Sequence, residues 1–271
     1  MASDQPRATS DEPRATSSGA EPHIIVRDLT MAYGSFVLMR ELTFTVNRSD
    51  VFIIMGGSGC GKSTLMRHLI GLKEPAKGEI FYGDMSFTKA TPDEREAKMQ
   101  RFGILYQSGA LFSSMTLAEN IGVPLEEYTD LSRQEIRQIA GLKLALVGLK
   151  GFEDYYPSQI SGGMQKRAGL ARAMAMDPEI LIFDEPSAGL DPISSHLLDQ
   201  LILQLRDSLG STIVVVTHEL ASIFAIGNNS VFLNVDKRTM TACGDPKELL
   251  NHSDDPDVRK FLSRGEGNGT G

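Results

Sequence analysis

Residues 51–64 read Val51-Phe52-Ile53-Ile54-Met55-Gly56-Gly57-Ser58-Gly59-Cys60-Gly61-Lys62-Ser63-Thr64, and this stretch decides the fold of the chain. Its first part is a short apolar run, which predicts a buried β-strand. A glycine-rich turn follows at once, and the apolar residues beyond it recur at helical spacing, at Leu65, Met66, Leu69 and Ile70. The stretch therefore predicts a strand, a loop and a helix in direct succession.

The loop matches the pattern G-x-x-x-x-G-K-[ST] from Gly56 to Ser63, and each residue type in it suits the binding of phosphate. The glycines allow successive backbone N–H groups to turn toward an anion, and the following helix offers its positive N-terminal end. Lys62 adds a full charge, and the hydroxyl of Ser63 can ligate Mg²⁺. We therefore predict that the loop binds a nucleoside triphosphate. The predicted binding residues are Gly56, Gly57, Ser58, Gly59, Cys60, Gly61, Lys62, Ser63 and Thr64.

The composition of the chain indicates a globular protein and weighs against several classes of function. Of the 271 residues, 41% are hydrophobic, which is enough for a sizeable core. The formal net charge of -8 disfavours a surface for DNA or RNA, so no nucleic-acid partner is expected. The two cysteines, Cys60 and Cys243, make no disulfide framework and favour a reducing compartment. We expect a cytosolic chain, because it has no signal segment and no apolar run of the roughly 18 residues that span a membrane.

Both ends of the chain are polar and are expected to be tails. Residues 1–20 contain a direct repeat, in which residues 4–10 are followed by the similar residues 11–17. A segment with so few large apolar side chains cannot offset the entropy that it loses on ordering, so we predict that residues 1–20 are disordered. The glycine-rich residues 265–271 are predicted to be flexible as well. One domain is therefore expected over residues 21–264.

The middle of the chain alternates between apolar runs typical of buried strands and segments with helical spacing. The runs at 102–106, 180–183 and 212–216 suit strands that are buried on both faces of a parallel sheet. Residues around 108–165 are helical in character, and we expect them to form a helical subdomain inserted into an α/β core. A further helix is expected over 192–209. Its predicted apolar stripe consists of Ile193, Leu197, Leu201, Leu205 and Leu209. These patterns predict an open α/β sheet with a ligand crevice at the carboxyl ends of its strands.

Polar residues follow three of these strands, where the crevice is expected. Asp184 and Glu185 end one strand; one carboxylate can hold Mg²⁺ while its neighbour orients or deprotonates water. His218, after the next strand, could reach a γ-phosphate, and Gln107 could touch the metal or the attacking water. Each has an ordinary alternative, namely a solvated acid pair, a packed or surface histidine, and a polar residue without function. Tyr33 taken alone is a turn or strand aromatic.

The order of these motifs resembles that of the nucleotide-binding domains of ABC transporters, and the resemblance covers about residues 22–262. It implies a P-loop NTPase core of the RecA type, with a small antiparallel β subdomain and the inserted helical subdomain. It also implies ATP as the nucleotide and Mg²⁺ bound by Ser63, Gln107 and Asp184. The resemblance assigns adenine stacking to Tyr33, catalysis to Glu185, His218, Gln107 and Lys62, and further nucleotide contacts to Ser161, Gly162, Gly163 and Asp191.

The resemblance also implies that each ATP site is completed by a second copy of the chain. Two copies would bind head to tail, so that Ser161-Gly162-Gly163 caps the γ-phosphate held by the partner copy. A serine and two glycines at the start of a helix suit this task, because they offer a hydroxyl and backbone N–H groups to an anion. ATP binding would then close the dimer, and hydrolysis would open it.

Met164 departs from the usual signature sequence of the family. The usual L-S-G-G-Q reads Ile160-Ser161-Gly162-Gly163-Met164 here, and methionine cannot make the hydrogen bonds of glutamine. The methionine at this position resembles the signature of the ATPase subunits of Mce-type lipid transporters. The stretches 106–116, 184–193 and 255–262 are also similar to those subunits. That branch implies an ATPase that drives phospholipid movement between the inner and outer membranes.

The resemblance to that branch further implies a membrane complex. The expected partners are a second copy of the chain, a permease of the MlaE type, a STAS-domain protein of the MlaB type and an MCE-domain protein of the MlaD type. The chain would then lie on the cytoplasmic face of the inner membrane. The apolar Ala110-Leu111-Phe112 is either the place that receives a helix of the permease or ordinary local core.

Two other functions remain open. The first keeps the ATPase and changes the cargo to sterols, other hydrophobic compounds or organic solvents. The second is a soluble ABC protein of DNA repair or translation, which would call for tandem ATPase domains or a long coiled-coil insertion and usually a basic surface. None of these features is visible in the sequence.

Overall fold

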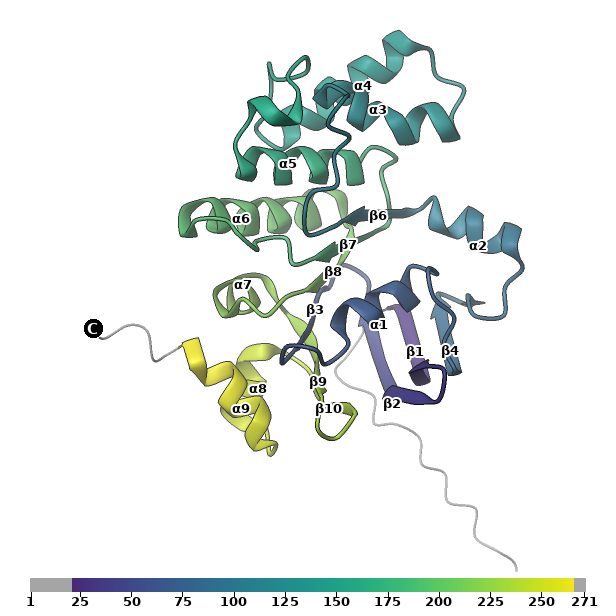
Figure 1. Cartoon of the computed structure of the whole chain (residues 1–271), viewed down its shortest axis with the longest axis vertical. Helices are drawn as coiled ribbons and strands as arrows, with labels where there is room; N and C mark the ends of the chain where they lie inside the picture. The colour runs from purple at the N-terminus through teal and green to yellow at the C-terminus, as the bar shows by residue number, and fades with distance from the viewer. Residues whose placement is uncertain (1–20, 266–271) are drawn as a thin grey trace, which may run out of the picture.

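The computed structural model describes residues 21–265, so the predicted tails at 1–20 and 265–271 lie outside the described residues except for Gly265. Figure 1 shows two sheets, with helix α1 (Lys62–Leu69) against both of them and a group of helices at one end of the molecule. The α/β architecture predicted from the alternating apolar runs is confirmed.

The larger sheet has six strands in the order β10-β9-β3-β8-β7-β6. All neighbouring strands are parallel except β10, which pairs antiparallel with β9 at the edge. The strands are β3 (Val51–Gly56), β6 (Phe102–Leu105), β7 (Ile180–Asp184), β8 (Thr212–Val216), β9 (Asn229–Asn234) and β10 (Thr239–Cys243). Because the strand that carries the phosphate loop lies inside this sheet, the carboxyl ends of β6, β7 and β8 meet the loop at one edge.

Each parallel strand sends alternate side chains to two separate apolar cores. In β7, Ile180 and Ile182 face the core that contains the smaller sheet and α1, whereas Leu181 and Phe183 face the core under the helices. All four side chains are fully buried. Burial on both faces is the physical reason why the sequence of β7 is apolar without alternation.

The smaller sheet has four antiparallel strands in the order β2-β1-β4-β5, as the family resemblance implies. The strands are β1 (Pro22–Tyr33), β2 (Phe36–Asn47), β4 (Lys77–Tyr82) and β5 (Met85–Ser86). Phe44 of β2 stacks on Phe52 of β3 with ring centroids 5.3 Å apart, so the two sheets share a core.

Capping boxes begin three of the helices, at Thr91, Thr116 and Ser132. The helices other than α1 are α2 (Pro92–Met99), α3 (Leu117–Tyr128), α4 (Arg133–Leu146), α5 (Gly162–Ala173), α6 (Pro192–Leu209), α7 (Leu220–Ile226), α8 (Pro246–His252) and α9 (Pro256–Leu262), with 3-10 turns η1 (Pro157–Gln159) and η2 (Ser263–Gly265). Within residues 21–265, every helix is too short or too polar to cross a bilayer. The limits of 108 and 165 for the helical subdomain stay a prediction.

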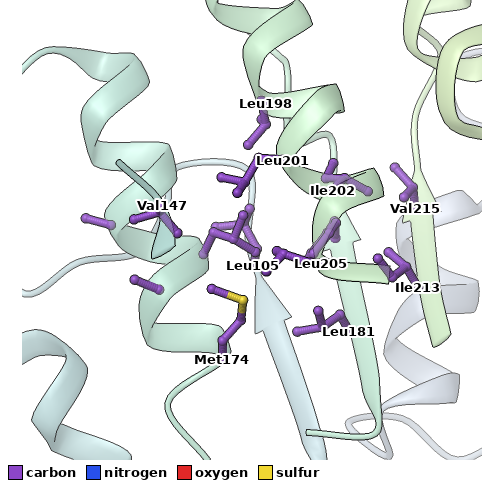
Figure 2. Close-up of a cluster of buried hydrophobic side chains, with 14 of the residues drawn as sticks. Leu105, Val147, Met174, Leu181, Leu198, Leu201, Ile202, Leu205, Ile213 and Val215 are labelled. Carbon is purple, nitrogen blue, oxygen red and sulfur yellow. The ribbon is translucent and has the colours of Figure 1, made fainter. Parts of the chain in front are cut away.

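Helix α6 has the predicted bounds, but its predicted apolar stripe is wrong. Ile193, Leu197 and Leu209 are 74%, 53% and 47% exposed, whereas Leu201 and Leu205 are buried. A step of four residues exceeds one helical turn by about 40°, so a line of such steps winds around the helix and leaves the core. The buried face consists of Leu198, Leu201, Ile202 and Leu205, which Figure 2 shows beside Leu105, Leu181 and Ile213.

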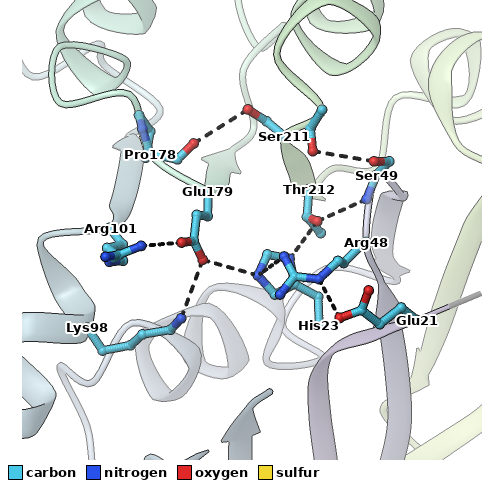
Figure 3. Close-up of polar contacts among 11 residues, drawn as sticks. Glu21, His23, Arg48, Ser49, Lys98, Arg101, Pro178, Glu179, Ser211 and Thr212 are labelled. Carbon is cyan, nitrogen blue, oxygen red and sulfur yellow. Dashed lines mark hydrogen bonds and ion pairs between the residues drawn. The ribbon is translucent and has the colours of Figure 1, made fainter. Parts of the chain in front are cut away.

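A polar cluster joins the two sheets at the end opposite the phosphate loop. His23 of β1 is 2% exposed, and its Nδ1 lies 2.7 Å from the hydroxyl of Thr212 at the start of β8. Its Nε2 lies 3.6 Å from a carboxylate oxygen of Glu179, which Lys98 also approaches, as Figure 3 shows. Burial, and then the charges of Arg48 and Lys98, lower the pKa of His23. The imidazole therefore links the two sheets, and its burial favours the neutral form.

Candidate functional site

The phosphate loop leaves β3 through a glycine that no other residue can replace. Gly56 has φ +148°, and an added Cβ would lie 2.5 Å from the carbonyl oxygen of Leu233. Gly61 caps α1 with φ +95° and offers no side-chain acceptor to the first turn. The N–H groups that begin α1 are therefore left for an outside anion.

Lys62 is folded back onto this loop. Its ammonium donates hydrogen bonds to the carbonyl oxygens of Gly56 and Gly57, each at 3.0 Å, and the residue is only 9% exposed. Both partners are neutral main-chain oxygens rather than carboxylates, so the positive charge is free to attract phosphate. The ammonium also holds the two ends of the loop together.

Ser63 and Asp184 form a pair of oxygen donors beside the loop. The hydroxyl of Ser63, in the first turn of α1, donates a hydrogen bond of 3.3 Å to Oδ1 of Asp184 at the end of β7. Burial raises the pKa of Asp184, and the hydrogen bond from Ser63 opposes that rise. A hydroxyl, a carboxylate and the amide of Gln107 are oxygen ligands of the kind that Mg²⁺ prefers, with phosphate and water as the others. Among residues 21–265 no cluster of three His, Cys, Asp or Glu side chains offers a metal site of another kind.

Glu185 and His218 form a carboxylate–imidazole pair at the ends of β7 and β8. His218 Nδ1 lies 2.7 Å from Glu185 Oε1. The Glu185 side chain is 13% exposed, whereas that of His218 is 65% exposed. Glu185 adopts φ +47°, and its N–H donates to the carbonyl oxygen of Val216 at 2.8 Å. A glutamate in this left-handed conformation costs about 1 kcal/mol, a strain that is typical of functional sites. The pair can orient and deprotonate a water molecule near the loop.

Tyr33, at the end of β1, lies at the other side of the loop. Its hydroxyl is 3.1 Å from that of Thr64, a contact that lowers the pKa of Tyr33. The ammonium of Lys73 lies 3.0 Å from the centroid of the ring, and the residue is 49% exposed. An exposed aromatic ring at the edge of the loop can stack on a planar base.

One cleft of about 760 Å³ brings most of the predicted residues together. Asp184 adjoins it through Ser63, and Cys60 is buried inside the loop. The predicted residues that line the cleft are Tyr33, Gly56, Gly57, Ser58, Gly59, Gly61, Lys62, Ser63, Thr64, Gln107, Glu185 and His218.

Ser161, Gly162, Gly163 and Asp191 do not line this cleft in the described part of the chain. Ser161 caps α5 and accepts a hydrogen bond from the N–H of Met164 at 3.3 Å, while Asp191 caps α6. Ser161, Gly162 and Asp191 are exposed. All four residues therefore lie outside the nucleotide cleft of their own chain, and Ser161, Gly162 and Asp191 are accessible to another molecule.

Several other residues at the cleft are not marked by any pattern in the sequence. Leu38, Leu220, Phe261 and Arg264 also line it. Phe261 packs against Phe232 of β9, with ring centroids 5.4 Å apart, so the C-terminal helix returns to the sheet. Such a contact depends on tertiary folding, and no local pattern predicts it. The same holds for Lys166 of α5, whose ammonium bonds the main-chain oxygens of Gln107 and Glu185.

Comparison with known families supports the same set of motifs. A family model described as ABC transporter matches residues 39–188. The matched range contains the phosphate loop, Gln107, the segment 161–163 and the acids Asp184 and Glu185.

Two kinds of relative are similar to most of the chain. The probable ribonucleotide transport ATP-binding protein mkl of Mycobacterium tuberculosis is 40% identical over 259 residues, which cover 96% of this chain and 70% of the relative. The intermembrane phospholipid transport system ATP-binding protein MlaF of Haemophilus influenzae is 38% identical over 246 residues, which cover 91% of this chain and 92% of the relative. The second similarity runs nearly end to end in both proteins.

Solved structures share the fold. The dimeric structure of MJ0796, a bacterial ABC transporter cassette, has a TM-score of 0.74 at 27% identity and covers 82% of this chain and 98% of that chain. A dimeric post-hydrolysis state of the same cassette, bound to ADP and Pi, has a TM-score of 0.72 at 28% identity.

Proposed function

Since the chain belongs to the ABC transporter family of ATPases, we propose that it powers a complex that moves phospholipids between the inner and outer membranes of a Gram-negative envelope. Such transport would maintain the lipid asymmetry of the outer membrane. The observation that carries the choice of cargo is the similarity to MlaF, which covers more than nine-tenths of both chains. The name of the mkl relative gives a different cargo, ribonucleotides, and the match covers 70% of that protein.

The residues around the cleft supply the parts of an in-line attack of water on the γ-phosphate. The loop and Lys62 would bind the phosphates, and Tyr33 would stack on the adenine. Glu185 would take the proton of the attacking water, with His218 holding its carboxylate in place. Ser63, Gln107 and Asp184 would hold Mg²⁺, which neutralises phosphate charge when bound. These proposed roles are supported by the position of the residues, which line or adjoin one cleft.

We infer that the site is completed by a second copy of the chain. The exposed Ser161, Gly162 and Asp191 do not line the cleft of their own chain within residues 21–265, so a partner copy is needed to bring them to a nucleotide. The similarity to a dimeric cassette supports this arrangement. Closure around ATP would couple nucleotide binding to a change in the membrane partner.

The membrane partner is proposed to be a permease of the MlaE type, with an MlaB-type STAS protein and an MlaD-type MCE protein in the same complex. The loop at Ala110–Phe112 suits contact with the permease, because Phe112 is 49% exposed and Arg172 lies over its ring at 5.9 Å. In such a complex the chain would lie on the cytoplasmic face of the inner membrane.

The test is to purify the full-length chain through a tag, with the proteins and lipids that accompany it, and to reconstitute the complex in vesicles. We expect a permease and phospholipids to copurify, and the ATPase rate to rise with phospholipid. The Glu185→Gln complex serves as the control for turnover. A rate that responds to ribonucleotides, sterols or organic solvents instead of phospholipids would reject the proposed cargo. An active ATPase that copurifies with no membrane protein would favour a soluble ABC protein.

A further inference from the structure

Lys166 of α5 is a buried cation that bonds the main chain of two candidate catalytic segments. The residue is 7% exposed. Its ammonium donates to the carbonyl oxygen of Gln107 and lies 3.4 Å from the carbonyl oxygen of Glu185. It therefore contacts both residues that are expected to act on the attacking water, through their backbone rather than their side chains.

The partners of Lys166 differ from those of a second buried lysine in the helical region. Lys143 of α4 is 5% exposed and forms an ion pair with the carboxylate of Asp177. A buried ammonium is costly unless an opposite charge is bonded to it, and Lys143 meets that condition. Lys166 bonds two neutral carbonyl oxygens instead of a carboxylate. Fold stability alone is a poor explanation for a lysine at this position.

The two carbonyl groups belong to neighbouring strand ends. Strands β6 and β7 pair in parallel, with Leu105 opposite Phe183. Gln107 lies two residues beyond the end of β6, and Glu185 lies directly after β7. The ammonium of Lys166 thus connects the segment that follows β6 with the segment that follows β7. It also supports the left-handed backbone of Glu185, a conformation that persists only where the surroundings hold it.

We propose that Lys166 is a positioning residue for ATP hydrolysis, which fixes the backbone of Gln107 relative to that of Glu185. The proposal rests on the proposed ATPase function of the cleft. Lys166 does not line the cleft within the described residues, so it acts through these two residues and not on the nucleotide. Because Lys166 lies in the helix that Ser161 caps, it also ties both loops to the segment offered to the partner copy.

The test compares Lys166→Met with Lys143→Met in the full-length chain, by ATPase kinetics and thermal unfolding. Loss of two hydrogen bonds from a charged donor should lower kcat by about 10- to 100-fold. The KM for ATP should stay within about threefold, because the phosphate contacts are untouched. Lys143→Met removes an equally buried lysine far from the cleft residues, so it should lower stability while the kcat of the folded protein stays unchanged. Lys166→Arg should restore kcat to within about threefold.

Several outcomes overturn the proposal. They are an unchanged kcat in Lys166→Met, a rise in KM without a fall in kcat, and an equal loss of kcat in both methionine variants. If Lys166→Met does not fold, Lys166→Leu takes its place, since its side chain is apolar and donates no hydrogen bond; a folded leucine variant with wild-type kcat also overturns the proposal. A wild-type chain that hydrolyses no ATP rejects the proposed function instead, so the two failures are distinguishable.

Discussion

Replacing Glu185 by glutamine should stop turnover and leave the fold intact. Glutamine has the same shape, so the hydrogen bond from the N–H of residue 185 to Val216 and the backbone at φ +47° are kept. The contact with His218, now 2.7 Å from the carboxylate, becomes a contact with an uncharged amide. That change should alter the free energy of unfolding by less than about 1.5 kcal/mol. Loss of the base should lower kcat by about 10² to 10⁴, which is about 2.7 to 5.4 kcal/mol of activation free energy.

The assay for Glu185→Gln is phosphate release at saturating ATP, with thermal unfolding and the binding of an ATP analogue measured on the same samples. The matched control is Glu219→Gln, which changes an exposed acid one residue beyond His218 that makes no side-chain capping bond to α7. The control should keep the wild-type kcat. The reasoning is refuted if Glu185→Gln retains more than a tenth of the wild-type kcat, or if it loses kcat only in proportion to lost folded protein.

Three further predictions concern binding, packing and pH. Lys62→Ala removes the charge offered to phosphate, so the affinity for an ATP analogue should fall by about 10- to 100-fold; unchanged affinity would contradict the assignment of the loop. Leu205→Ala leaves a cavity in the core shown in Figure 2, so the free energy of unfolding measured in urea should fall by about 2 to 5 kcal/mol. Leu197→Ala, at a residue 53% exposed, should cost less than about 1 kcal/mol, and equal losses would reject the corrected helix face. Because the pKa of His23 is lowered on folding, the unfolded chain binds that proton more tightly, and stability should fall as the pH drops below 6.5. The slope is at most about 1.4 kcal/mol per pH unit, and it should be reduced in His23→Gln.

Features that depend on neighbouring residues could be predicted from the sequence. The phosphate loop was predictable because its strand, glycines and helix are contiguous, and the capping box at Ser132 was predictable for the same reason. The apolar run of β7 indicated burial on both faces, which the two cores explain. The stripe of α6 failed because spacing by four residues approximates the helical period without matching it, as the exposure of Ile193 shows.

Features that depend on tertiary contacts could not be predicted. Lys166 is one of several cations in its helix, and its burial between Gln107 and Glu185 follows only from the packing of α5 against the sheet. Arg264 lines the cleft because the C-terminal helix folds back toward the phosphate loop. The family resemblance assigned roles to the segment 161–163, but the exposure of Ser161 and Gly162 and their position outside the cleft of their own chain are visible only in the structure.

The central claim is that each ATP site combines the cleft of one chain with the segment 161–163 of another. The most direct measurement joins two inactive variants, Ser161→Arg and Glu185→Gln, in one dimer that is purified through a different tag on each chain. One of the two composite sites in this mixed dimer is intact, so we predict about half of the wild-type ATPase rate, although each variant alone is inactive. A mixed dimer no more active than the two variants alone would contradict completion of the site by a partner copy.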